Sequence, residues 1–419
     1  MNTHPPSPQA GRRIVDVAIL GGGVAGSALA LTLARDGFDV ALVEREATFR
    51  DRIRGESIHP WGVRELTNLG LRDVVIDRAG GQELPRWTRY RDGQESESFA
   101  WAELFPGSPG EISVRHPRLQ QALLDTAREA GVDVYRPATA EPRRANGRIG
   151  LTITTDRDSF DVTCRLLVGA DGQRSALRTW IGGTGRRDPI HHAIGGAIVS
   201  GIDLAPDSAH QAYFDEGFVM IFPQVGGTNR LYYICPTEVA EAQQRAPQPE
   251  TIMASVASVL PPGAIGEWTS AGPAGFFPNA EIVADRIHAE SVVLIGDAAG
   301  SNDPSQGHGL SLVFRDIREL RTLLRESSDW SEVPAAYAAH RTAYFDVLHQ
   351  HAHWSGPLVT ESGPEADALR ARVAAARAID PTAGGFAAIF ATGPDGLVAD
   401  EAARRHFLGE DLTADQYST

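Results

Sequence analysis

Apolar residues gather in four short, nearly continuous runs along the chain. The runs cover residues 14–20, 39–44, 164–170 and 291–296. Runs of this length without polar alternation predict strands that are buried on both faces, as in a parallel sheet. Between the first two runs the apolar spacing is that of a helix, so residues 14–44 predict a complete β-α-β unit.

The rest of the chain follows other patterns. Helical spacing occurs at 60–75 and 117–130, and residues 147–170 predict a pair of strands. Strand-like runs indicate a β-rich layer within 190–280, and the chain beyond residue 330 is mainly helical. The segments of the parallel sheet are therefore interleaved with the β-rich segments and do not precede them as one block.

These patterns predict an α/β fold: a Rossmann-like nucleotide-binding domain interleaved with a mixed β-sheet substrate domain, followed by a helical C-terminal region. We expect the nucleotide-binding domain to comprise residues 14–80, 113–185 and 285–330. The substrate domain is expected at 81–112 and 186–284, the helical region at 331–419, and a disordered tail at 1–13.

The turn after the first strand carries a dinucleotide fingerprint. Residues 21–26 read Gly-Gly-Gly-Val-Ala-Gly and match G-x-G-x-x-G between a strand and a helix. Gly21 allows the tight turn, Gly23 lets a pyrophosphate approach the backbone, and Gly26 lets the helix pack on the strand. Glu44 ends the next strand, where an acid accepts hydrogen bonds from ribose hydroxyls and would repel a 2′-phosphate. The first site thus suits FAD or NAD and not NADP.

Two further segments place polar residues at strand ends. Asp171 follows the run 164–170, with Ser175 and Arg178 at short offsets. Asp297 follows the run 291–296 and begins a loop that contains Pro304 and two glycines before a helix starts. The carboxyl ends of strands in an open α/β sheet are where ligands bind, so both aspartates are candidate ligand contacts.

Composition limits the classes of partner and reaction. The net charge of −15 argues against nucleic acid as a partner, and the chain has no lysine, which excludes lysine chemistry. The two cysteines form no regular framework, the first 13 residues lack an apolar signal core, and no apolar run approaches the roughly 20 residues that span a bilayer. We therefore expect a cytoplasmic protein without a membrane partner.

The three motifs, in this order and at these separations, resemble the class A flavoprotein monooxygenases, which are similar to para-hydroxybenzoate hydroxylase, over about residues 14–320. The resemblance implies FAD as cofactor, NADPH or NADH as transient reductant without a domain of its own, and a flavin C4a-hydroperoxide that inserts one oxygen atom into a small organic substrate of aromatic or polyketide-like type. The chain departs from the family pattern at His116, Gly300, His308 and Ser311.

The resemblance and the motifs together define a set of site residues. Arg52 is expected to receive NAD(P)H and Arg54 to contact FAD. The expected FAD-binding residues are Gly21, Gly23, Val24, Ala25, Gly26, Glu44, Arg45, Arg54, His116, Gln120, Asp171, Asp297, Pro304, Gly307, His308 and Gly309. The substrate pocket is expected between the β-rich layer and the flavin, with a wall formed by Tyr213, Phe214, Met220, Phe222 and Tyr232.

Histidines supply the remaining candidates. His192 and His308 are candidate catalytic acid–base groups, and no other catalytic base can be assigned from the sequence. His349 and His353 would share one helical face, as metal ligands do, but no clear acidic ligand accompanies them. We therefore expect a solvated or helix-terminal histidine cluster and no metal.

Three other functions are compatible with an FAD fold. A flavin-dependent dehydrogenase or saturase-type reductase would pass electrons without inserting oxygen, and a non-catalytic FAD-binding protein would have damaged flavin motifs, whereas these are intact. A flavin-dependent halogenase uses an active-site lysine, which this chain lacks. Among oxygen insertions, the sequence leaves hydroxylation, epoxidation, Baeyer–Villiger insertion and N-oxidation open, as it does substrate identity, the choice between NADH and NADPH, and oligomeric state.

Overall fold

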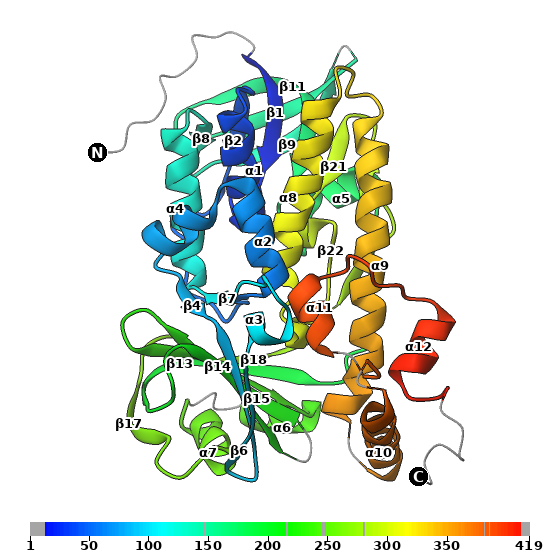
Figure 1. Cartoon of the computed structure of the whole chain (residues 1–419). Coiled ribbons are helices and arrows are strands. Elements are labelled where there is room, and N and C mark those ends of the chain that lie inside the picture. The colour runs from blue at the N-terminus through cyan, green and yellow to red at the C-terminus, as the bar shows by residue number, and fades with distance from the viewer. Residues whose placement is uncertain are drawn as a thin grey trace.

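Two large sheets lie at opposite ends of the molecule and are bridged by long helices (Figure 1). The computed structural model describes residues 13–411 except 146, 215–216, 245–248, 280, 362, 381 and 385. Most of the expected tail lies outside these residues, but Arg13 begins the first strand and bonds to Asp39 at 3.3 Å, so its assignment to the tail is wrong.

The first sheet contains all four of the predicted buried strands. Its strand order is β20-β21-β11-β1-β2-β8, and β21, β11, β1, β2 and β8 run parallel. The antiparallel pair β9 and β10 extends it from β11. The bounds are β1 Arg13–Leu20, β2 Val40–Val43, β8 Asp133–Tyr135, β9 Thr139–Ala145, β10 Arg148–Thr154, β11 Ser159–Gly169, β20 His288–Ala289 and β21 Val292–Leu294.

The second sheet is largely antiparallel and joins two distant stretches of the chain. Its order is β17-β13-β16-β15-β14-β5-β6, with β18 paired to β13. The bounds are β5 Arg86–Arg91, β6 Gln94–Ala100, β13 Ala193–Ile202, β14 Ser208–Phe214, β15 Gly217–Gln224, β16 Thr228–Cys235, β17 Ile265–Ser270 and β18 Gly275–Pro278. The mixed β-sheet region expected from the sequence is therefore present, and residues before 101 supply the two strands β5 and β6 at one edge of it.

Two small sheets lie between the large ones. One has the order β3-β7-β4, with bounds Ser57–Ile58, Glu111–Ser113 and Gln82–Leu84. The other has the order β12-β19-β22, with bounds Gly185–Arg187, Ile282–Ala284 and Gly300–Ser301. Because β22 follows Asp297 in the chain, the second small sheet carries part of the loop 297–309.

Helices cover the parallel sheet, pack on one face of the second sheet and form the C-terminal region. Their bounds are α1 Val24–Arg35, α2 Pro60–Leu69, α3 Trp101–Leu104, α4 His116–Glu129, α5 Ala176–Trp180, α6 Thr237–Gln244, α7 Pro249–Val259, α8 Gly309–Glu326, α9 Val333–Thr360, α10 Pro364–Ile379, α11 Phe386–Thr392 and α12 Glu401–Phe407. Short helical turns occur at Val74–Arg78, Gly296–Ala298 and Pro304–Gln306. Within the described residues, no helix combines the length and the apolar character needed to cross a membrane.

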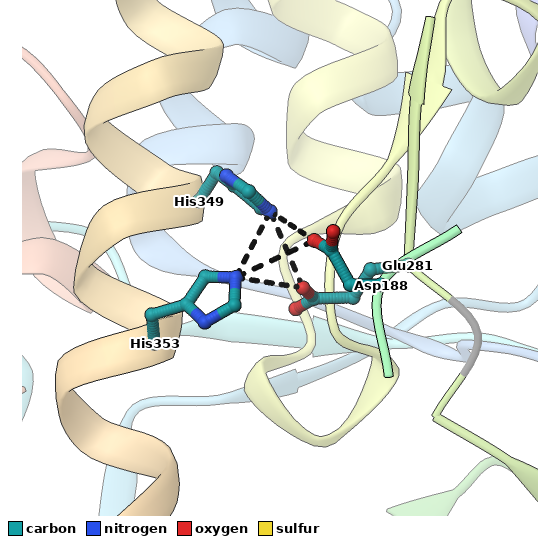
Figure 2. Close-up of side chains that lie close together, drawn as sticks. All are labelled: Asp188, Glu281, His349 and His353. Carbon is teal, nitrogen blue, oxygen red and sulfur yellow. Dashed lines mark hydrogen bonds and ion pairs between the residues drawn. The ribbon is translucent and has the colours of Figure 1, made fainter. Parts of the chain in front are cut away.

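Helix α9 corrects the expectation of a solvated histidine cluster. The ring of His349 is buried, and His349 and His353 face the carboxylates of Asp188 and Glu281 (Figure 2). These acids lie more than 60 positions away in the sequence, so spacing along the chain gave no sign of them.

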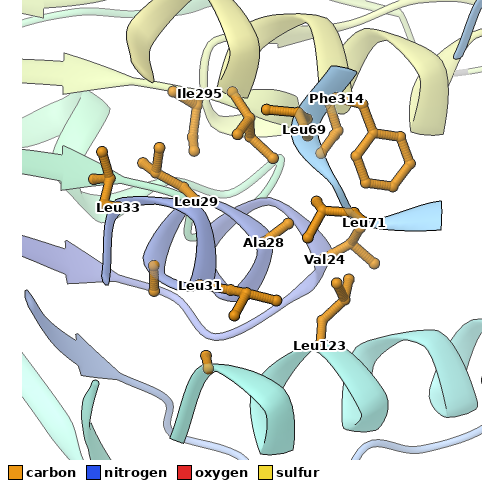
Figure 3. Close-up of a cluster of buried hydrophobic side chains, with 14 of the residues drawn as sticks. Val24, Ala28, Leu29, Leu31, Leu33, Leu69, Leu71, Leu123, Ile295 and Phe314 are labelled. Atoms are coloured by element: carbon orange, nitrogen blue, oxygen red, sulfur yellow. The ribbon is translucent and has the colours of Figure 1, made fainter. Parts of the chain in front are cut away.

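The main core surrounds α1, which packs between the parallel sheet and the helices α4 and α8 (Figure 3). Leu29, Leu31 and Leu33 are fully buried there, together with Phe314 of α8. This apolar contact fixes the N-terminus of α1 at the carboxyl end of β1. The fold thereby places the glycine turn at the edge of the sheet where ligands bind.

Candidate active site

A cavity of about 1720 Å³ runs from the carboxyl ends of the parallel strands to the inner face of the second sheet. Sites for one drug-sized ligand typically enclose roughly 300–1,000 Å³, so this cavity has room for a dinucleotide and a second molecule. Each of the three sequence motifs contributes to its wall, through Gly23, Asp171 and Asp297.

The glycine turn forms one end of the cavity. Gly21 has a φ of +107°, which L side chains rarely adopt, and a Cβ at Gly26 would lie 1.9 Å from the carbonyl oxygen of Gly21. These two glycines are thus required by the turn and by the packing of α1, as predicted. At Gly23 the nearest atom to a built Cβ is Nε2 of Gln120 at 3.7 Å, which leaves this backbone open toward the cavity.

Backbone hydrogen bonds fix the carboxylate of Glu44 at the end of β2. Its carboxylate accepts hydrogen bonds from the backbone N–H groups of Gly22 at 2.8 Å and of Glu46 at 2.7 Å. The residue is 8% exposed and lines the cavity beside the glycine turn. A carboxylate fixed in this place suits hydroxyl donors of a ribose.

The second motif is tied to the third by an arginine. Asp171 caps α5 through Oδ2, which accepts hydrogen bonds from the N–H groups of Ala176 at 2.7 Å and Leu177 at 3.2 Å. The buried Arg178 donates to the carbonyl oxygens of Ala298 at 2.9 Å and Gln173 at 2.6 Å. The offset of Arg178 from Asp171 therefore serves to join two loops of the cavity wall.

Several buried polar atoms of the cavity wall have no partner within the described protein. They include Oδ1 of Asp171 and both amide atoms of Asn302. Buried polar atoms without partners are costly, so such a group in a cavity wall indicates a ligand that supplies the missing hydrogen bonds. Asn302 belongs to the loop 297–309, and Asp171 lines the same cavity.

A histidine beneath the loop 297–309 fixes its shape. Nε2 of His59 lies 2.8 Å from the carbonyl oxygen of Gln306, and Nδ1 lies 2.9 Å from Oε1 of Glu111. Oε2 of Glu111 accepts a hydrogen bond from Ser57 at 3.0 Å. At Gly307, where φ is +70°, a Cβ would lie 2.7 Å from Nε2 of His59, so the loop turns against this ring.

Comparisons with known proteins agree with this geometry. The family model described as "FAD binding domain" matches residues 14–343. This chain belongs to the FAD-binding domain family. FAD is therefore the cofactor, and the resemblance to class A flavoprotein monooxygenases is confirmed.

The relatives of this FAD-binding chain include several oxygenases. It is 29% identical to salicylate hydroxylase of Pseudomonas putida, over 74% of this chain and 77% of that protein. It is 28% identical to squalene epoxidase 3 of Arabidopsis thaliana, over 75% of this chain, and the match spans 61% of the epoxidase. The structure of p-nitrophenol 4-monooxygenase PnpA from Pseudomonas putida DLL-E4 has the same fold, with a TM-score of 0.74 at 19% identity, over 97% of this chain and 98% of that one.

Most of the expected FAD-binding residues line the cavity. The lining includes Gly21, Gly23, Val24, Ala25, Glu44, Arg45, Arg54, His116, Gln120, Asp171, Asp297, Pro304, Gly307 and Gly309, and also Arg52. Gly26 acts through packing alone. The residues fit FAD because the open backbone at Gly23, the acid at Glu44 and the unpartnered atoms at the loop 297–309 match its pyrophosphate, ribose and polar ring edge.

The two histidines expected as acid–base groups take other positions. Neither His192 nor His308 is among the described residues that line the cavity, and both are buried. The ring of His308 stacks on Phe390 with 5.3 Å between ring centroids, and burial lowers its pKa well below the usual value. His192 lies 3.3 Å from Asp303, behind the loop. Direct contact of these rings with a ligand in the cavity is therefore not supported, because each side chain turns into the protein.

The second sheet presents an aromatic face to the cavity. Four of the five expected pocket residues are in the lining, namely Tyr213, Met220, Phe222 and Tyr232. Phe214 is not: its ring packs on Tyr233 at 5.4 Å between centroids, on the opposite face, which α7 covers. Alternate residues of a strand point to opposite faces, so neighbours such as Tyr213 and Phe214 cannot both reach the cavity.

Glu56, which local pattern does not single out, is buried and joins the arginine segment 52–55 to the second sheet. Oε2 of Glu56 accepts hydrogen bonds from Gln224 at 2.7 Å and from Nε of Arg230 at 2.9 Å. Its Oε1 accepts from the backbone N–H of His116 at 2.8 Å. The only sequence signal was an acid next to a short apolar segment, and its partners lie 60 to 174 positions away.

Proposed function

We propose that this chain is an FAD-dependent, NAD(P)H-consuming monooxygenase that inserts one oxygen atom into a small aromatic or polyketide-like substrate. The observation that carries this proposal is the continuity of the cavity, in which the FAD cradle opens directly onto the aromatic face of the second sheet. The overall reaction converts substrate, O2, NAD(P)H and a proton into oxygenated substrate, NAD(P)+ and water.

The substrate end of the cavity is walled by rings. Beyond the four residues named above, the wall contains Trp87, Phe99, Trp101, Phe218, Phe276, Phe277 and Phe390. Aromatic walls favour a flat apolar substrate and exclude water from the reacting centre. The salicylate hydroxylase and p-nitrophenol monooxygenase relatives act on aromatic compounds by their names, which supports the same substrate class here.

The charged end of the cavity suits a nicotinamide dinucleotide. Arg52 and Arg54 are exposed at the cavity wall, and the carbonyl of Arg54 accepts a hydrogen bond from Tyr232. Two guanidinium groups beside the flavin would hold the phosphates of a transient reductant. Bound FAD supplies hydride acceptance and activation of O2.

Titratable groups of the wall favour neutral forms. Burial raises the pKa of Tyr213 and of Tyr232, and burial lowers the pKa of His116. Near neutral pH these side chains are uncharged, so they orient a substrate by hydrogen bonding and contact without acting as anionic bases. The helix α8 begins at Gly309 in the wall, and its N-terminus favours negative charge on a reduced flavin.

The decisive test measures nucleotide oxidation and the fate of O2 in one assay. Purified holoenzyme is mixed with NADPH or NADH and a panel of aromatic and polyketide-like compounds, while nucleotide oxidation, O2 uptake, peroxide release and product mass are recorded. We expect one compound class to stimulate oxidation with little peroxide and to gain one oxygen atom. No reduction by either nucleotide, with electrons passing between substrate and flavin, would instead support a dehydrogenase or saturase. The assay is repeated with bromide and chloride, and a halogenated product would also overturn the proposal.

Two broader expectations belong to this proposal. The substrate is the partner that the site requires, and nucleic acid and membrane are not expected. The cytoplasm, where NAD(P)H is available, stays the predicted location.

A further inference from the structure

Four potential metal ligands from three segments converge beside α9. Asp188 follows β12, Glu281 precedes β19, and His349 and His353 lie one turn apart on α9 (Figure 2). Their ligand atoms all lie within 4.8 Å of one another. Figure 2 shows the two rings and the two carboxylates pointing toward a common centre.

The separations match a tetrahedral centre. Nε2 of His353 lies 3.2 Å from Nε2 of His349, 3.4 Å from Oδ2 of Asp188 and 3.4 Å from Oε2 of Glu281. Nε2 of His349 lies 3.3 Å from Oε2 of Glu281. A tetrahedron with zinc–ligand bonds of about 2.0–2.1 Å has edges of about 3.3 Å. Of the two remaining pairs, His349 and Asp188 are 2.6 Å apart in a direct hydrogen bond that an ion would replace, and the oxygens of Asp188 and Glu281 lie within 4.8 Å of each other.

The burial and the charge of these four side chains also favour a bound cation. The side chains of Asp188, Glu281 and His349 are at most 8% exposed, whereas that of His353 is 42% exposed. Two buried carboxylates are costly without positive charge between them. Arg186 contacts Oδ1 of Asp188 from an exposed position, which leaves Oδ2 directed at the centre. The exposed edge of His353 gives an ion a path from solvent.

We propose that Asp188, Glu281, His349 and His353 bind one divalent transition-metal ion, with Zn²⁺ as the ion that the ligand set fits. Two imidazoles and two carboxylates in tetrahedral array suit zinc, whereas Mg²⁺ prefers octahedral oxygen ligands. With four protein ligands the site is closed, so the ion is structural.

The position of the site defines its effect. Strand β12 pairs with β19, and β19 pairs with β22 in the loop 297–309. An ion held by Asp188, Glu281 and α9 would fasten the long helix to the small sheet that carries part of the flavin-binding loop. We expect zinc to raise the melting temperature of the holoenzyme and to slow its loss of FAD.

Metal binding is measured on tag-free holoenzyme, because a histidine tag would itself bind zinc. The protein is stripped with a chelator, loaded with Zn²⁺, desalted and analysed for metal per chain, and Co²⁺ is used in parallel as a spectroscopic probe. The variant His353→Ala removes the exposed ligand with little risk to folding. The matched control is His340→Ala, since His340 is exposed on the same helix and faces Glu319 at 3.3 Å.

We expect about one zinc ion per wild-type chain and an intense visible Co²⁺ spectrum typical of four-coordination. His353→Ala should weaken zinc binding by at least about tenfold, and His340→Ala should not. Substoichiometric zinc in the wild type, equal binding by His353→Ala, or displacement of zinc by equimolar Mg²⁺ would each overturn the proposal. None of these readouts requires turnover, so their failure is distinct from failure of the proposed monooxygenase activity.

Discussion

The backbone N–H of Gly22 donates a hydrogen bond of 2.8 Å to Oε2 of Glu44. A Cβ built on Gly22 would lie 2.7 Å from Cβ of Glu44, which real side chains do not tolerate. The fingerprint leaves this second position variable, but here the acid at the end of β2 packs directly on it. The glycine turn and Glu44 are thus one structural unit.

Alanine substitutions at Gly22 and Gly23 should therefore separate packing from cofactor binding. Gly22→Ala should displace Glu44 and lower the stability of the flavin-free protein by about 1–3 kcal/mol, a usual cost of overpacking. At Gly23 a new Cβ would have 3.7 Å of clearance within the protein, so Gly23→Ala should change the stability of the flavin-free protein by less than about 1 kcal/mol. The same substitution should weaken FAD binding at least about tenfold, because the added methyl group obstructs the pyrophosphate. Urea unfolding and FAD titration measure the two effects. Wild-type FAD affinity in Gly23→Ala would contradict this account.

Asp297 should hold FAD through hydroxyl groups. It lines the cavity at the end of β21, and burial raises its pKa while Arg54 opposes that shift. Asp297→Ala should lower FAD affinity about tenfold or more, and Asp297→Asn should lose less because the amide oxygen still accepts a hydrogen bond. FAD content after gel filtration is compared with that of Asp156→Ala, a change in an exposed turn. An Asp297→Ala protein that purifies fully yellow would rule out this role.

Arg52 and Arg54 should control the reduction of the flavin by NAD(P)H. Arg54→Ala should slow flavin reduction by NAD(P)H about tenfold or loosen FAD, and Arg52→Ala should mainly raise the KM for the nucleotide, because a lost phosphate contact weakens binding. Anaerobic stopped-flow reduction and FAD occupancy are measured for both, with the exposed Arg157→Ala as control. Unchanged reduction together with full occupancy in Arg54→Ala would count against the assignment.

Adjacent residues of β14 offer a test of the substrate wall. Tyr213 lines the cavity, and Phe214 packs against Tyr233 on the other face of the sheet. Tyr213→Ala should raise the KM for the substrate about three- to tenfold and increase peroxide release, because an aromatic contact is lost and water enters. Phe214→Ala should lower the melting temperature and leave the KM unchanged. If both variants shifted the KM equally, the wall would be misassigned.

An ion pair joins α8 to the end of α1, and its contribution to the stability of the fold should depend on pH. Arg321 donates to both oxygens of Asp36, at 2.6 and 2.7 Å, and this hydrogen bonding holds the pKa of Asp36 below its usual range. A carboxyl with a lowered folded pKa stabilises the fold above its unfolded pKa of about 3.9, and this contribution is lost as the pH falls through the folded value.

Arg321→Ala should accordingly cost about 1–3 kcal/mol of unfolding free energy at pH 7, and the difference from wild type should shrink as the pH falls from about 5 to 3. Arg325→Ala is the control, since Arg325 lies 3.8 Å from Asp36 and is 57% exposed. A destabilisation by Arg321→Ala that is constant over this pH range would show that the ion pair does not act as described.

Local pattern was enough to predict the cofactor cradle. The strand before Gly21, the turn itself, Glu44, Asp171 and Asp297 are close to strand ends, and strand ends of a parallel sheet meet at one edge whatever the loops do. Helices such as α4 were equally visible, because their apolar spacing depends only on neighbours along the chain. Strand β8 was missed because its three residues are too short for a pattern.

The direction of each side chain in the second sheet could not be predicted from the local sequence pattern. The strands β13 to β16 are buried on both faces, so their sequences lack the polar alternation that would have separated Tyr213 from Phe214. The direction of the acid–base candidates was hidden for a related reason, since a histidine in a binding loop can point into the cavity or behind it, and His308 is not in the cavity lining.

The sequence by itself determined the FAD fold, because each nucleotide motif is a short turn whose function requires particular residues at fixed spacing. Only the tertiary structure decided which distant side chains meet. Glu56 contacts Arg230, and His59 contacts Glu111. His349 contacts Asp188, which lies 161 positions away in the sequence. Such pairs depend on how helices and sheets pack, and neither hydrophobic periodicity nor local spacing carries that information.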